Sequence, residues 1–169
     1  MSSTWAYFWP CLGIGAAVGI IAGAFAFPRR NRKKRYTALA IGVLASLALT
    51  ALWHGPFGGA DLFATKAQRG IQETLTYLEM NQVTARLHRN PLTRHVLLSG
   101  PADDFQRSEL VRYMNQVPGV ESASWSRTAS AGLPLILEGM AASLAGFLFG
   151  LFLAYLVELH RRYNAQWNW

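Results

Sequence analysis

The sequence contains few cysteines of the kind that crosslink small secreted proteins, and it lacks the common motifs of enzyme active sites. Cys11 is the only cysteine among 169 residues, so no internal disulfide can form. We expect it to be a small buried apolar residue. Ser99 lies in Leu-Ser-Gly rather than in the Gly-x-Ser-x-Gly setting of a hydrolase nucleophile, and no glycine-rich phosphate loop occurs. The sequence therefore predicts neither a catalytic residue nor a cofactor.

Charge is missing from three long stretches of the chain. Trp5–Phe27 and Tyr36–Trp53 contain no charged residue, and Pro134–Val157 contains only Glu138. A bilayer core of about 30 Å needs roughly 20 apolar residues of helix. Because no water reaches the backbone there, each stretch must be helical. We predict an integral membrane α-helical protein with three transmembrane helices, the first two formed by residues 5–27 and 36–53 and the third within residues 134–158.

Basic residues predict how the chain is oriented. The connection 29–35 carries Arg29, Arg30, Arg32, Lys33, Lys34 and Arg35. Short loops rich in Lys and Arg stay in the cytoplasm. We therefore expect the chain to span a bacterial inner membrane. The N-terminus and residues 55–133 would lie in the periplasm, and the tail 159–169 in the cytoplasm. The first stretch does not resemble a cleaved signal peptide, because no basic residue precedes it.

The net charge of +7 follows from the same basic segments. Residues 55–133 hold nearly equal numbers of basic and acidic side chains, whereas the connection and the tail hold the excess. A basic protein of this kind would otherwise suggest a nucleic-acid partner. Here the charge is a topology signal with some attraction to anionic lipid headgroups, and we expect no nucleic-acid binding.

Small residues recur at every fourth position of the predicted spans. Small side chains on one helix face allow two backbones to approach closely. The pattern predicts packing faces, which either join the three helices to one another or bind a neighbouring membrane protein. The residues are Gly15, Gly19, Gly23, Gly42, Ser46, Gly146 and Gly150.

Between the spans, the hydrophobic periodicity predicts a small α+β domain of residues 55–133. Apolar residues at helical spacing predict a helix over about Thr65–Asn81. Strict alternation over Val83–His88 predicts a strand, and His95–Ser99 is its predicted hairpin partner across the Asn90-Pro91 turn.

A second helix and a third strand complete the predicted order α-β-β-α-β. Asp103 and Gln106 have the spacing of a capping box at a helix N-terminus. Pro118-Gly119 ends this helix, and Val120–Ser126 is the predicted third strand. Gly100 and Gly119 lie at turns that need a positive φ.

Residues of about 65–127 resemble a BON domain, a small module of bacterial envelope proteins. The resemblance rests on Leu98-Ser99-Gly100 at the end of a strand, on the helix that follows, and on Val117-Pro118-Gly119-Val120 leading into the last strand. It implies a non-catalytic module that binds phospholipid, cell-wall components or protein partners. Many family members carry paired domains and no membrane anchor, whereas this chain has one copy held at both ends.

The predicted hairpin also carries the candidate partner-binding residues. Its tip is either a binding surface or merely solvated, and it gathers Arg86, His88, Arg89, Arg94 and His95. The two histidines could face each other across the hairpin as a two-ligand metal site, but a third ligand is not apparent, and we predict no metal. Glu138 either acts within the membrane or reaches the interface, and the second interpretation is favoured.

These features favour a membrane-anchored scaffold that presents its outer domain to a lipid, cell-wall or protein partner. The alternative is an accessory subunit of a larger inner-membrane complex of the photosynthetic or respiratory type. In that case the small-residue faces and aromatic ends would contact neighbouring membrane or periplasmic proteins. A small transporter subunit is disfavoured because no span carries a polar stripe.

Overall fold

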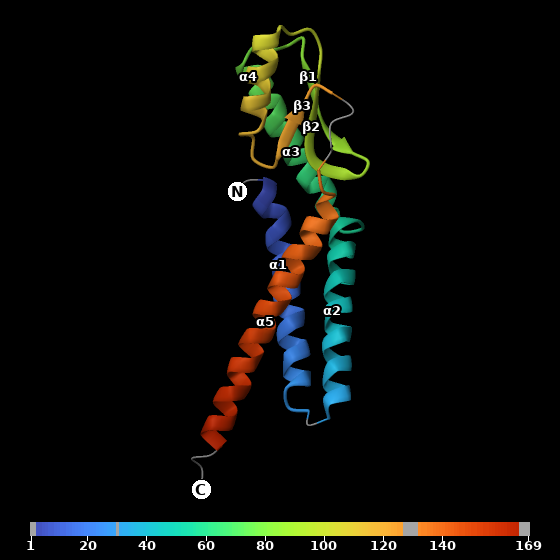
Figure 1. Ribbon diagram of the computed structural model, residues 1–169, viewed down its shortest axis with the longest axis vertical. Coiled ribbons are helices and arrows are strands. Elements are labelled where there is room, and N and C mark those ends of the chain that lie inside the picture. Colours follow the sequence, from blue (N-terminus) through green and yellow to red (C-terminus); the bar gives the residue numbers. More distant parts are fainter. Residues whose placement is uncertain (1–2, 30, 127–131, 166–169) are drawn as a thin grey trace. The chain divides into compact units, whose positions relative to one another are not determined.

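The computed structural model describes residues 3–29, 31–126 and 132–165. Within them the chain forms five helices and three strands (Figure 1). The elements are α1 (Ser3–Ala26), α2 (Arg32–His54), α3 (Gly59–Tyr77), β1 (Thr84–Arg89), β2 (Leu92–Ser99), α4 (Asp104–Met114), β3 (Ser122–Ser124) and α5 (Leu135–Ala165). From α3 to β3 this is the predicted order α-β-β-α-β. The chain divides into two compact units, a sheet unit (residues 1–7 and 58–138) and a helical unit (residues 8–57 and 139–169).

Three of the helices are long and apolar enough to cross a membrane. They cover Thr4–Ala26, Arg32–His54 and Leu135–Asn164, with lengths of 23, 23 and 30 residues. At about 1.5 Å per residue, each exceeds the roughly 30 Å of a hydrocarbon core. The length and composition of these helices support a multi-pass membrane protein.

The predicted loop at residues 29–35 is too long, and two helices extend beyond their apolar runs. Arg32, Lys33, Lys34 and Arg35 belong to the first turn of α2 rather than to a connecting loop, because the Asn31 side chain caps the helix by accepting the Lys33 amide at 3.0 Å. Arg30 lies outside the described residues. The predicted tail is also helical through Ala165, since α5 continues past the apolar run. The length of each apolar run therefore predicted which part of the helix suits a membrane, but it did not predict where the helix begins or ends.

The small residues of the helical unit bring three helices together. A methyl group at Gly15 or Gly19 of α1 would collide with backbone atoms of α5 at Ser143 or Phe147. Gly146 and Gly150 of α5 face backbone atoms of Leu12 and Ala16 in the same way. At these positions only a hydrogen atom fits, so α1 and α5 lie in direct backbone contact.

The remaining small residues contact other side chains of the same unit. Gly42 of α2 lies against Ala22 and Phe147, and Gly23 lies against Ala154. Ser46 of α2 and Ser143 of α5 share a hydrogen bond of 2.7 Å, and both are fully buried. All seven predicted packing residues therefore lie between helices of this chain. Cys11 is buried as expected.

The sheet unit has the strand order β1-β2-β3. β1 and β2 form the expected antiparallel hairpin, with Leu87 opposite Val96, and β3 runs parallel to β2. The α3 helix contacts β1, α4 contacts β3, and the two helices contact each other beside the strands (Figure 1). The core lies between these helices and the sheet and includes Phe63, Ile71, Leu98, Leu110 and Met114.

The predicted boundaries of the first helix of this unit are also wrong. α3 begins at Gly59 rather than near Thr65, because Gly58 adopts a left-handed φ of 73° and lets the chain enter the helix directly. It ends at Tyr77 rather than Asn81. Two residues beyond Tyr77, Glu79 has a φ of 55°, which is not helical. The helix therefore reaches back to bury Phe63 and Ala64.

The predicted cap and turns of this unit are confirmed. The Asp103 carboxylate accepts the Gln106 amide at 2.7 Å, and the Gln106 side chain accepts the Asp103 amide at 3.2 Å. This reciprocal pair is a capping box. Gly100 and Gly119 have φ values of 132° and 102°, which side chains rarely adopt.

Candidate functional site

The five predicted partner-binding residues do not share one exposed surface. Arg86 and Arg89 are exposed on β1, and His88 is partly exposed, with its Nδ1 atom 2.9 Å from the Pro91 carbonyl. Arg94 and His95 are largely withdrawn from solvent and bonded to other residues. Only the β1 half of the predicted cluster is therefore available to a partner.

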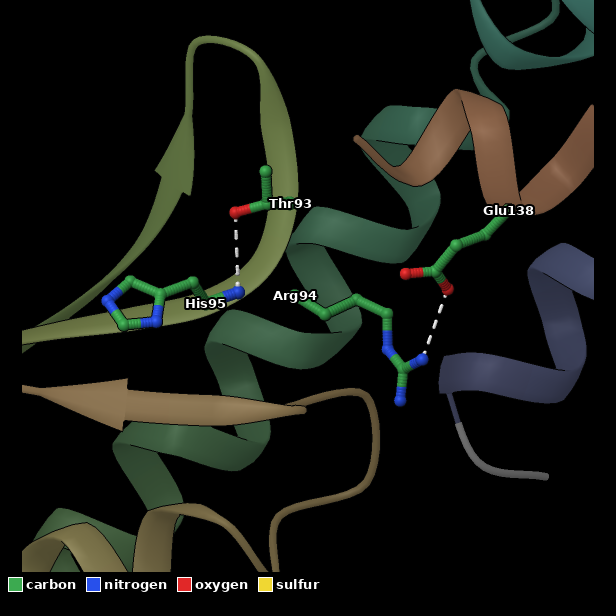
Figure 2. Close-up of polar contacts among 4 residues, drawn as sticks. All are labelled: Thr93, Arg94, His95 and Glu138. Carbon is green, nitrogen blue, oxygen red and sulfur yellow. Dashed lines mark hydrogen bonds and ion pairs between the residues drawn. The ribbon is translucent and has the colours of Figure 1, made fainter. Parts of the chain in front are cut away.

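Arg94 forms an ion pair with Glu138. The Arg94 Nη1 atom lies 3.1 Å from a Glu138 carboxylate oxygen, and the two side chains are 24% and 18% exposed (Figure 2). Glu138 is in the first turn of α5, where a negative charge is favoured by the helix dipole. The pair ties β2 to the first turn of α5 and uses both charges internally.

His95 is buried and both of its ring nitrogens are engaged. Nδ1 lies 2.9 Å from the Ser122 hydroxyl and Nε2 lies 3.0 Å from the Ser124 hydroxyl. Since Ser124 donates its own proton to the Ser126 carbonyl, it accepts from Nε2, and Nδ1 accepts from Ser122. Burial lowers the pKa of His95, with a smaller contribution from nearby His88. The neutral ring therefore crosslinks β2 to β3.

The two hairpin histidines do not form part of a larger ligand set. The His95 ring is occupied by serines, and Figure 2 shows it on the side of β2 opposite to Arg94. Within residues 3–29, 31–126 and 132–165, no group of three or more His, Cys, Asp or Glu side chains could hold a metal ion. Among these residues, the serine partners of His95 leave neither of its ring nitrogens free to bind a metal.

An open groove runs along β1, the edge strand of the sheet. Its volume is about 440 Å³, and its lining includes Gln68, Gln72, Thr84, Arg86 and Arg89. The described residues place no acidic side chain in this lining. Arg86 and Arg89 have no ion-pair partner in the described part of the chain. The groove can therefore receive a negatively charged group.

The side chain of Gln68 occupies the backbone edge of β1 next to this groove. Its amide nitrogen donates to the Ala85 carbonyl at 2.8 Å, and its oxygen accepts the Leu87 amide at 3.1 Å. A neighbouring strand would make the same two bonds through its peptide groups. Sequence reasoning missed this residue, because a glutamine on a helix gives no sign that it faces a strand edge.

Comparisons of the chain with protein families, with curated proteins and with solved structures found no match.

Proposed function

We propose that this protein is a non-catalytic membrane-anchored interaction protein. Its three long helices hold the sheet unit at a membrane, and the sheet unit binds an anionic group of a protein, lipid or cell-wall partner. The proposal includes a BON-like identity for the sheet unit, which is supported by its order of elements and by the turns at Gly100 and Gly119.

The observation that carries the proposal is the basic groove beside β1. Arg86 and Arg89 present guanidinium groups without acidic partners among the described residues, beside a groove of about 440 Å³. Guanidinium groups bind carboxylates and phosphates through paired hydrogen bonds. The groove can therefore recognise a carboxylate or a phosphate, and its lining residues suggest binding rather than catalysis.

The proposed location is a bacterial inner membrane, with the sheet unit in the periplasm. The basic residues Arg29 and Arg32–Arg35 support this orientation, because positively charged connections are retained in the cytoplasm. A reporter active only in the periplasm, fused at Asn31, should be inactive. Its activity would contradict the orientation and leave the binding proposal untouched.

Site-specific photo-crosslinking in cells tests the binding proposal. A photoreactive amino acid at Gln72, an exposed lining residue, leaves both arginines in place and should give a discrete adduct, which the additional change Arg86→Glu should remove by replacing one of the two positive charges with a negative one. The control position is Phe105, which is 75% exposed on α4 and lies away from the groove. Equal adducts at both positions, or an adduct that persists with Arg86→Glu, would contradict the proposal. The mass of the adduct distinguishes a protein from a lipid or a wall fragment.

The alternative of an accessory subunit draws no support from the small-residue faces. Together with the aromatic ends, those faces were a reason to expect docking onto a neighbour's helices, and they contact one another within this chain. The geometry therefore favours the interaction protein.

A further inference from the structure

A second cavity lies within the helical unit, between the last turns of α1 and the second half of α5. Its volume is about 450 Å³, and its walls are mostly apolar, including Ile20, Ala24, Phe27, Leu153 and Val157. Ile20, Ala24, Leu153 and Val157 belong to helices that are apolar enough to cross a membrane, and Phe27 directly follows α1. An apolar groove at this position is filled by hydrocarbon in a bilayer.

Charged side chains line one end of this groove. Glu158 and Arg161 contribute to its wall just beyond the apolar run of α5. The Glu158 carboxylate is already neutralised, since it accepts a hydrogen bond from the Arg162 Nε atom at 2.8 Å. Arg162 also donates to the Phe27 carbonyl at 3.3 Å, so its position is set by two acceptors.

Among the residues that the structure describes, Arg161 is the charged lining residue without a partner. It makes no hydrogen bond or ion pair with any residue that the structure describes. An occupant must therefore combine a long apolar chain with a negative charge at one end.

We propose that this groove binds one anionic membrane phospholipid. One acyl chain lies along Ile20, Ala24 and Leu153, and the phosphate group accepts hydrogen bonds from Arg161. A basic pocket between membrane helices at the level of the headgroups suits such a lipid. The site is separate from the groove beside β1 and does not depend on which side of the membrane it faces.

Native mass spectrometry of the full-length protein in a neutral detergent tests this site. Palmitoyl-oleoyl phosphatidylglycerol should be retained as a single bound molecule about fivefold more tightly than palmitoyl-oleoyl phosphatidylcholine, because one guanidinium near the headgroup contributes on the order of 1 kcal/mol. Arg161→Gln should reduce this preference to none. Equal retention of the two lipids by the unchanged protein would overturn the proposal.

The matched control is Arg32→Gln, which removes one charge at the basic connection from an exposed residue that does not line the groove. This variant should keep the preference for phosphatidylglycerol. If Arg32→Gln and Arg161→Gln lower it equally, the attraction is general and the proposed site is wrong. Inorganic phosphate should not displace the lipid, and displacement would show that the ligand is a soluble anion instead.

A second variant tests the apolar part of the site independently. Ala24→Trp fills the groove and should abolish retention of both lipids, whereas Ala40→Trp, at an exposed position of α2 outside the groove, should leave retention unchanged. Helix content measured by circular dichroism establishes that each variant is folded. Full retention by folded Ala24→Trp would contradict the proposal even if Arg161→Gln failed to fold.

Discussion

Arg94 and Glu138 are 44 residues apart in the chain, and their side chains meet at 3.1 Å between β2 and the first turn of α5 (Figure 2). The pair is mostly shielded from water, which makes it stronger than an exposed pair and its disruption more costly. The Arg94 Nε atom is also buried and finds no acceptor among the described residues, so Glu138 supplies the one polar contact of this guanidinium there.

Removal of the Glu138 charge should therefore destabilise the sheet unit. We expect Glu138→Gln to cost between about 1 and 3 kcal/mol, because it leaves a largely buried guanidinium without its carboxylate. Thermal unfolding of the full-length protein in detergent measures the effect. The control is the double variant with Arg94→Gln, which should recover part of the loss. Strictly additive losses would show that the two charges are not coupled.

The Gln68 side chain should contribute more to the free energy of unfolding than the side chain of Gln72, which lies one turn later on α3. Gln68→Ala leaves the Ala85 carbonyl and the Leu87 amide without their main partner, so we expect a loss of about 1–3 kcal/mol. Gln72 reaches the Ala85 carbonyl only at 3.5 Å, and Gln72→Ala should cost well under about 1 kcal/mol. The measurement is the free energy of unfolding. A larger loss for Gln72→Ala than for Gln68→Ala would contradict the role given to the two Gln68 hydrogen bonds.

The same substitution should make the protein more prone to self-association. Without Gln68, the backbone groups of an edge strand are open to pairing with another chain. Size-exclusion chromatography or light scattering at increasing protein concentration should detect this for Gln68→Ala and not for Gln72→Ala.

His95 predicts a pH dependence of stability. Burial first, and then nearby His88, lower the pKa of His95 below its usual value of about 6.5. Below about pH 6.5 the unfolded chain binds a proton that the folded sheet unit does not. The free energy of unfolding therefore decreases as the pH is lowered, until the lowered pKa of the folded state is reached. Above about pH 6.5 the ring is neutral in both states and contributes no slope.

Unfolding midpoints between about pH 7.5 and pH 5.5 check this sign. His95→Gln should be less stable at the upper pH but lose less on acidification than the unchanged protein. His88→Gln is the control, because it removes only the smaller cause and should keep most of the slope. An unchanged slope in His95→Gln would show that another group titrates.

The helix contacts predict opposite outcomes for two glycines. Gly146→Ala places a methyl group against the backbone oxygen of Leu12 and 3.1 Å from the Ala16 nitrogen, so α1 and α5 must separate. We expect a loss of about 1–3 kcal/mol, as for other overpacked sites. Gly13→Ala has nothing within 4 Å and should leave stability unchanged or raise it. Equal unfolding midpoints in mixed micelles for the two variants would rule out close packing at Gly146.

The sequence by itself determined the features that depend on neighbours along the chain. Apolar length located the three long helices, alternation located β1 and β2, and the spacing of Asp103 and Gln106 located the cap of α4. Each of these is a local property, because helix and strand periodicities and helix caps involve residues a few positions apart. Helix ends were less well predicted, since Gly58 and Asn31 start α3 and α2 earlier than hydrophobicity alone indicates.

Only the tertiary structure decided which polar residues are left for a partner. It withdrew Arg94 and His95 from the predicted cluster, placed Gln68 on the β1 edge, and paired Ser46 with Ser143 across 97 residues. It also decided that the small-residue faces contact one another, which their spacing had left open. The physical reason is that these contacts join residues brought together by burial of the apolar surface between the elements, and no periodicity along the chain records which side chain then lies opposite which.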